Sequence, residues 1–197
     1  MLVLLANVAM VVALVIVGFV SHSLGVLAAG GDYLGDAAGV ALSLVALRLS
    51  RRQHGHSRAP AYAALANATF LLAVTAVVIV EALRRLIAGA PHIAGLPVIV
   101  VSLIAGAVMA ACALIIGTVE SDDLNMRSVM LDTLADGASA AGVAVSGAII
   151  LAAKGVYWLD SAVALAVATI IAYHAIKLIR AVLARLRTHP ERSVGVV

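Results

Sequence analysis

The stretch that decides the fold reads Gly30-Gly-Asp32-Tyr-Leu-Gly-Asp36-Ala-Ala-Gly39, in the middle of an apolar run from about residue 24 to 49. A second apolar run, from about residue 126 to 153, holds a matching Asp132-Thr-Leu-Ala-Asp136. Each run is long enough to cross a bilayer as a helix. An ionised aspartate near the centre of such a helix costs roughly 2.5–3.5 kcal/mol. Four of them need compensation, and a bound cation is the obvious candidate.

The composition is that of an integral membrane protein. Hydrophobic residues make up 64% of the chain, charged residues only 12%, and the mean hydropathy is +1.15, whereas a soluble domain is nearer half apolar. The apolar runs are continuous rather than alternating, which excludes a membrane β-barrel and leaves helices as the spanning element. We therefore expect an all-α, polytopic protein of a bacterial inner or plasma membrane. Its six transmembrane helices are expected at about residues 1–20, 24–49, 60–86, 97–118, 126–153 and 159–179.

The basic residues predict the orientation. Six spans place both termini on one side, and most Lys and Arg residues fall on that side, namely Arg48, Arg51, Arg52, Arg58, Lys177, Arg180, Arg185, Arg187 and Arg192. The positive-inside rule then predicts that both termini are cytoplasmic. We expect residues 1–186 to form the six-helix domain and residues 187–197 a short basic tail. The net charge of +3 is explained by these span ends, so no nucleic-acid partner is expected.

The spacing of the aspartates predicts a metal site. Residues four apart lie on one face of an α-helix, so Asp32 and Asp36 present two carboxylates together, as do Asp132 and Asp136. If the two helices face each other, four oxygen ligands converge on a site for a divalent cation. Four buried carboxylates cannot all stay ionised without such a cation, and a bound metal would expel their protons. A site that faces each side of the membrane in turn would exchange metal for protons.

Five motifs, in order along nearly the whole chain, resemble the cation diffusion facilitator (cation efflux) family. They are Ser23-Leu-Gly-Val-Leu-Ala with the first aspartate pair, His54-Gly-His-Ser-Arg58, Glu81-Ala-Leu-Arg-Arg85, Asp123-Leu-Asn-Met-Arg127 with the second pair, and Trp158-Leu-Asp160. The resemblance implies a six-helix transporter that exports divalent metals from the cytoplasm against protons, commonly as a homodimer. It assigns the metal-ligand role to Asp32, Asp36, Asp132 and Asp136.

Two departures from the family pattern bear on the function. Zinc-transporting members usually have His at the position of Asp132, and an all-carboxylate site shifts the preference toward harder ions. Zinc and manganese therefore both stay open as the transported substrate, with iron, cobalt and cadmium behind them, and no resident cofactor is expected. The resemblance also covers only the transmembrane domain, because a short tail follows the last span where family members usually carry a C-terminal cytoplasmic domain. Two interpretations stay open, a minimal member of the family and a piece of a longer protein.

Several other residues carry weaker expectations. His54 and His56 could capture metal in a cytoplasmic loop, although a solvated polar loop explains them as well. Glu81 has the spacing to pair with two arginines at an exposed helix end. Asp160 is expected to cap the sixth helix, and Asn67 to make an inter-helix hydrogen bond.

The aspartate pattern differs from the metal-binding motif of a known class of membrane enzymes. Membrane phospholipid synthases need a single composite motif with an Arg after Asp-Gly, and no Arg follows Asp136-Gly137. We therefore expect no enzyme and no catalytic residue. A non-transporting membrane metal sensor, or a subunit of a larger transport assembly, is the alternative that stays open.

Overall fold

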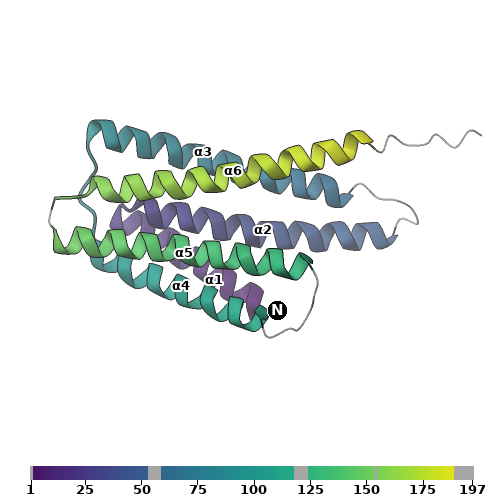
Figure 1. The fold of residues 1–197 in the computed structure, drawn as a ribbon, viewed down its shortest axis with the longest axis horizontal. Coiled ribbons are helices and arrows are strands. Elements are labelled where there is room, and N and C mark those ends of the chain that lie inside the picture. The colour runs from purple at the N-terminus through teal and green to yellow at the C-terminus, as the bar shows by residue number, and fades with distance from the viewer. Residues whose placement is uncertain (1, 53–58, 118–123, 154, 189–197) are drawn as a thin grey trace, which may run out of the picture.

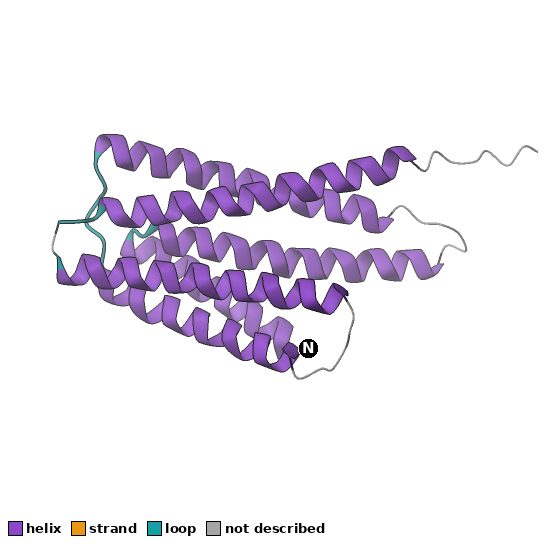
Figure 2. Cartoon of the chain, in the orientation of Figure 1, coloured by secondary structure: helices purple, strands orange, loops and turns teal. Residues whose placement is uncertain are grey.

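The computed structural model describes residues 2–52, 59–117, 124–153 and 155–188, and over these residues the chain is an elongated bundle of helices without a strand (Figures 1 and 2). The helices are α1 (Leu2–Ser21), α2 (Leu24–Arg52), α3 (Ala59–Ala88), α4 (Gly95–Gly117), α5 (Leu124–Ala152) and α6 (Trp158–Thr188). The predicted all-α class with six long helices is confirmed.

Helices α2 and α6 continue beyond the membrane spans that the sequence predicts for them. The apolar run suggested that the last helix ends near Ile179, but α6 continues to Thr188, and α2 continues to Arg52. The apolar run reports the thickness of the bilayer, whereas a helix satisfies its own backbone hydrogen bonds and can continue into water. In Figure 1, α2, α3 and α6 extend beyond the other helices at one end of the bundle.

Helix α2 lies at the junction of two layers. α3 packs along α6 and α4 packs along α5, while α2 contacts both pairs and α1 (Figure 1). Val26 and Tyr33 of α2 belong to a buried cluster with α1, α4 and α5, and Leu24 and Ala28 belong to a second cluster with α3 and α6. The helix that carries the first aspartate pair is therefore held from both sides.

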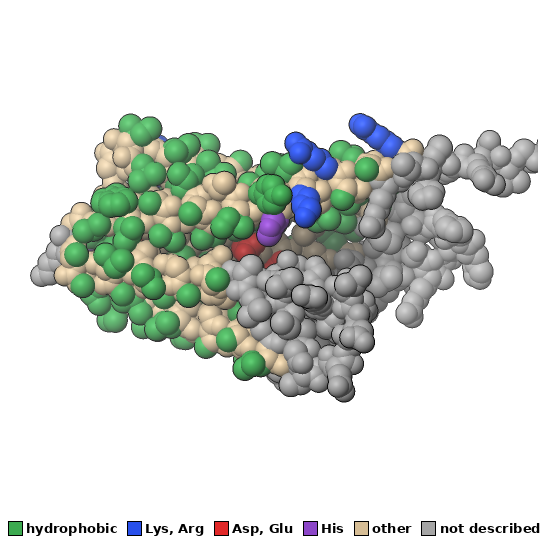
Figure 3. All heavy atoms as spheres, in the orientation of Figure 1, with side chains coloured by type: hydrophobic (Ala, Val, Ile, Leu, Met, Phe, Trp, Pro, Cys, Tyr) green, Lys and Arg blue, Asp and Glu red, His purple; other side chains and the backbone are tan. Residues whose placement is uncertain are grey.

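The outer surface of the bundle is apolar. Phe19, Val77 and Ile87 are 66%, 70% and 87% exposed, and hydrophobic side chains cover most of the described face in Figure 3. Among the described residues, Ala61–Ala88 and Trp158–Ala184 are long and apolar enough to cross a membrane. Such a surface suits lipid rather than water.

Both ends of the helical region lie at one end of the bundle. Figure 1 shows α1 beginning and α6 ending toward the same end, as an even number of antiparallel spans requires. Which side of the membrane this end faces stays a prediction. At the opposite end, Gly89 closes α3 with a φ of 101°, a left-handed conformation that suits glycine after a helix.

Candidate metal-binding site

A row of glycines brings α2 against α3. A Cβ atom at Gly31 would lie 3.0 Å from Val74 Cγ1, one at Gly35 would lie 2.8 Å from Leu71 Cδ1, and one at Gly39 would lie 2.9 Å from Asn67 Nδ2. These glycines are four residues apart, so they share one face of α2. Because the backbones approach so closely there, the rotation of α2 about its axis is fixed, and Asp32 and Asp36 lie on the neighbouring face.

Tyr33 secures the same helix on another side. Its side chain is only 2% exposed, and its hydroxyl donates a hydrogen bond to the carbonyl oxygen of Ala105 in α4 at 3.2 Å. A buried tyrosine usually finds such a partner. Sequence reasoning missed this contact, although a tyrosine between the two aspartates of an apolar helix is a signal that could have suggested it.

The structure brings aspartates of α2 and α5 together. Asp32 is half-buried, and both Asp136 of α5 and Asp36 of its own helix lie close enough for their charges to act on it. Neighbouring carboxylates repel each other, so such a group is stabilised when protons or a cation neutralise part of its charge. The arrangement therefore suits a site that binds either protons or a cation between two helices.

Two of the predicted groups lie outside what the structure describes. Asp132 falls within α5, one turn before Asp136 and on the same helical face, but its side chain is not among those described. His54 and His56 fall in residues 53–58, outside the described residues. Among the side chains that are described, no three His, Cys, Asp or Glu groups already meet in the manner of a metal site.

Asp36 lies on the open side of this arrangement. Its side chain is exposed, and Figure 3 shows acidic side chains at the surface about half-way along the bundle, beside α5 and α6. Lysine and arginine side chains of the described residues lie on the same face, further toward one end (Figure 3). Asp36 therefore lies nearer the surface of the bundle than Asp32 does.

Asp160 caps a different helix from the one predicted. Its carboxyl oxygens accept hydrogen bonds from Ser23 Oγ at 2.5 Å, from the backbone N–H of Leu24 at 2.7 Å and from that of Gly25 at 3.3 Å. The expectation that Asp160 caps its own helix α6 is therefore wrong, because the side chain points across to the first turn of α2. The residue is completely buried, and it ties the start of the aspartate-bearing helix to α6.

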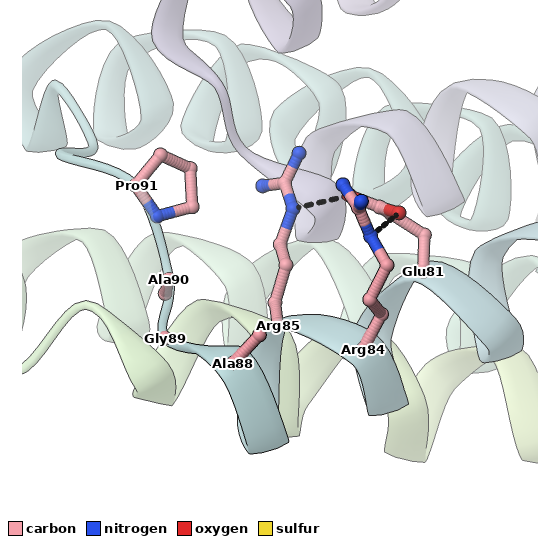
Figure 4. Close-up of a pocket in the computed structure, with 7 residues that line it drawn as sticks. All are labelled: Glu81, Arg84, Arg85, Ala88, Gly89, Ala90 and Pro91. Atoms are coloured by element: carbon pink, nitrogen blue, oxygen red, sulfur yellow. Dashed lines mark hydrogen bonds and ion pairs between the residues drawn. The ribbon is translucent and has the colours of Figure 1, made fainter.

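The predicted ion pairs of Glu81 are confirmed at the end of α3. Arg84 Nε lies 2.8 Å from Glu81 Oε2 and Arg85 Nε lies 3.0 Å from Glu81 Oε1 (Figure 4). Arg85 also donates to the carbonyl oxygen of His22 at 2.6 Å. These side chains line a shallow pocket with Ala88, Gly89, Ala90 and Pro91. The charged groups here pair with one another, and the hydrogen bond from Arg85 to His22 holds the turn between α1 and α2 against the end of α3.

Comparison with known proteins agrees with this picture. The family model for the cation efflux transmembrane domain matches residues 1–186. The zinc transporter ZitB of Pectobacterium atrosepticum is 36% identical over 148 residues, which are 71% of this chain and 46% of that protein.

Two further relatives are similar over more of the chain. The cadmium, cobalt and zinc/H(+)-K(+) antiporter of Bacillus velezensis is 28% identical over 171 residues, 81% of this chain and 54% of the relative. The metal cation efflux system protein CzcD of Cupriavidus metallidurans is 28% identical over 159 residues, 78% of this chain and 50% of the relative. The chain thus spans about half the length of these relatives. Since the family model matches nearly the whole sequence, this chain belongs to the cation efflux, or cation diffusion facilitator, family and is an integral membrane protein.

Proposed function

We propose that this chain is a transporter rather than an enzyme, and that it moves a divalent metal cation out of the cytoplasm in exchange for protons. The observation that carries the proposal is the close approach of Asp136 of α5 to Asp32 of α2, beside Asp36. Asp132, one turn from Asp136, supplies the fourth ligand in this proposal.

The exchange follows from charge balance. In the apolar interior, clustered carboxylates are neutralised either by protons or by a divalent cation. A cation that binds Asp32 and Asp136 must displace the protons that otherwise neutralise them, because a carboxyl oxygen that ligates a metal gives up its proton. Protons that bind again after the cation leaves restore the first state. If each state opens to a different side, one cycle exports metal and imports protons.

Zinc and manganese are the first substrates to test. Four carboxylates offer only oxygen ligands, which suit Mn²⁺ and similar ions, while the general order of affinities favours Zn²⁺ over Mn²⁺. The relatives are named for zinc, cadmium and cobalt, so these ions complete the panel with iron. Asp132 is the position at which a substitution should shift the choice, and Asp132→His should raise the preference for Zn²⁺.

Flux measured in proteoliposomes tests the proposal. The purified chain is reconstituted with a pH dye inside, and each metal is added in turn under an imposed proton gradient. Metal entry should be accompanied by proton movement in the opposite direction, and Asp36→Asn or Asp136→Asn should abolish both. Glu81→Gln, which removes a carboxylate at the end of the bundle, is the matched control and should keep both. Metal flux without proton movement would refute the exchange, and full flux in both aspartate variants would refute the site.

The same assay separates the alternative function. A metal sensor, or a subunit that needs a larger assembly, would bind metal through the aspartates but carry none when reconstituted alone.

We also propose that the chain acts as a homodimer in the bilayer, which cross-linking in the same proteoliposomes would show.

A further inference from the structure

Asn67 of α3 is a polar side chain whose amide oxygen has no partner in the described part of the chain. Its Oδ1 atom is buried, and no donor among the described residues lies within hydrogen-bond distance. The amide oxygen of Asn67 therefore accepts no inter-helix hydrogen bond from the described residues. Buried polar atoms are nearly always satisfied in proteins, so an orphaned oxygen needs an explanation.

The position of this amide relates it to the aspartates. A Cβ atom at Gly39 would lie 2.9 Å from Asn67 Nδ2, whereas the glycines one and two turns earlier face the apolar Leu71 and Val74. Gly39 follows Asp36 by three residues, and residues at this spacing are neighbours on the surface of a helix. Asn67 thus packs against α2 at a residue that lies within one helical turn of Asp36, on the side toward the end of α2, with its Oδ1 atom 3.9 Å from the same Cβ position.

The order of these residues along α2 indicates which of them a cation would meet first. Asp32, which lies close to Asp136, is further from that end of the helix than Asp36, and Asn67 comes before both. The end of α2 is on the side that the basic residues predict to be cytoplasmic. A cation that enters from that side would meet Asn67 first, then Asp36, and then the carboxyl pair.

We propose that Asn67 Oδ1 is a further ligand of the transported cation, and that it receives the cation before Asp36 does. This inference rests on the proposed transport function. A carboxamide oxygen is a hard, neutral donor of the kind that binds Ca²⁺ and similar ions in proteins. Its neutrality matters, because a neutral ligand adds affinity without adding another charge to the apolar interior. As an oxygen donor it supports Mn²⁺ more than the softer Cd²⁺.

The test compares substitutions that keep or remove the oxygen. Asn67→Leu has a similar size but no donor atom, and Asn67→Asp keeps an oxygen at the same place. Thr69→Val is the control on the same helix, since its hydroxyl only donates back to the carbonyl oxygen of Leu65 at 2.8 Å. KM and Vmax for Mn²⁺ and Cd²⁺ flux are measured for each variant in proteoliposomes.

We expect Asn67→Leu to raise KM for Mn²⁺ about 10-fold, as the loss of a supporting group does at metal sites, with a smaller rise for Cd²⁺ and little change in Vmax. Asn67→Asp should keep KM near or below the parent value, and Thr69→Val should match the parent. A purely structural role for Asn67 would instead lower the Vmax for both ions alike. Parent-like KM values for both ions in Asn67→Leu would overturn the inference.

A second pair of variants covers the case in which Asn67→Leu does not fold. Gly39→Ala pushes on the amide without changing its chemistry, and Gly142→Ala adds the same methyl group where nothing lies within 4 Å. Gly39→Ala should raise KM for Mn²⁺ and Gly142→Ala should not; equal KM values in the two would overturn the inference. The parent protein in the same assay separates the two levels, because absence of metal flux in the parent would remove the proposed function itself, whereas parent flux beside a parent-like Asn67→Leu would remove only this inference.

Discussion

The cap that Asp160 places on α2 predicts a large and local loss of stability on its removal. Asp160→Ala deletes the acceptor for Ser23 Oγ at 2.5 Å and for the backbone N–H of Leu24 at 2.7 Å, both buried. Each short hydrogen bond contributes about 1–1.5 kcal/mol, and a buried donor left without a partner adds to the cost. Loss of a helix N-cap alone costs about 0.5–2 kcal/mol. We expect Asp160→Ala to cost about 3 kcal/mol.

Thermal unfolding in detergent measures this cost. For a chain of this length, 1 kcal/mol corresponds to about 2–4 °C, so the midpoint should fall by about 10 °C. The chain has one tryptophan, Trp158, two residues before Asp160, and its fluorescence reports the same region. Ser161→Ala is the matched control, because the buried hydroxyl of Ser161 has no partner among the described residues.

A double-mutant cycle sharpens the result. Ser23→Ala removes the same hydrogen bond from the other side, so the double variant with Asp160→Ala should lose less than the sum of the single losses. Additive losses would show that the two side chains do not interact. A parent-like melting temperature for Asp160→Ala would refute the whole account of the cap.

Two other contacts predict contrasting pairs of variants. Arg85→Ala should destabilise the protein by about 1 kcal/mol, because it loses the hydrogen bond to the α1–α2 turn. Arg84→Ala should melt like the parent, because the Arg84 side chain is 72% exposed. Equal melting midpoints in the two variants would show that Arg85 does not hold this turn. Gly95→Ala should lower the free energy of unfolding by about 1–3 kcal/mol, since its Cβ would lie 2.7 Å from a backbone oxygen of α5. Gly142→Ala, where nothing lies within 4 Å, should be neutral or slightly stabilising. Parent-like stability of Gly95→Ala would refute the close approach of α4 to α5.

Local spacing predicted much of this molecule. The lengths of the apolar runs gave six helices, because the bilayer fixes how many apolar residues a span needs. The spacing of Glu81 and its two arginines predicted their pairing, since residues three and four apart meet on a helix. The same rule placed Asp32 and Asp36 on one face of their helix.

Contacts between distant residues could not be predicted in this way. Asp160 and Ser23 are 137 residues apart, and capping rules consider only a residue's own helix. Tyr33 meets the backbone of α4 only because α2 has a particular rotation, which the glycine contacts with α3 fix. The extra turns of α6 were missed because hydropathy reports the membrane and not the end of a helix. The orphaned oxygen of Asn67 appears only when all its neighbours are known.

The central claim is that one group of aspartates binds either protons or a divalent cation. Proton release on metal binding tests it most directly, because it needs neither a gradient nor a known direction of transport. The purified protein is titrated with Zn²⁺ or Mn²⁺ in weakly buffered detergent solution with a pH indicator, and released protons are counted against bound metal. We predict that protons are released with each bound cation. In Asp32→Asn and Asp136→Asn, both the tight binding of the metal and the proton release should be lost. Tight metal binding without proton release, or unchanged release in both variants, would contradict the account.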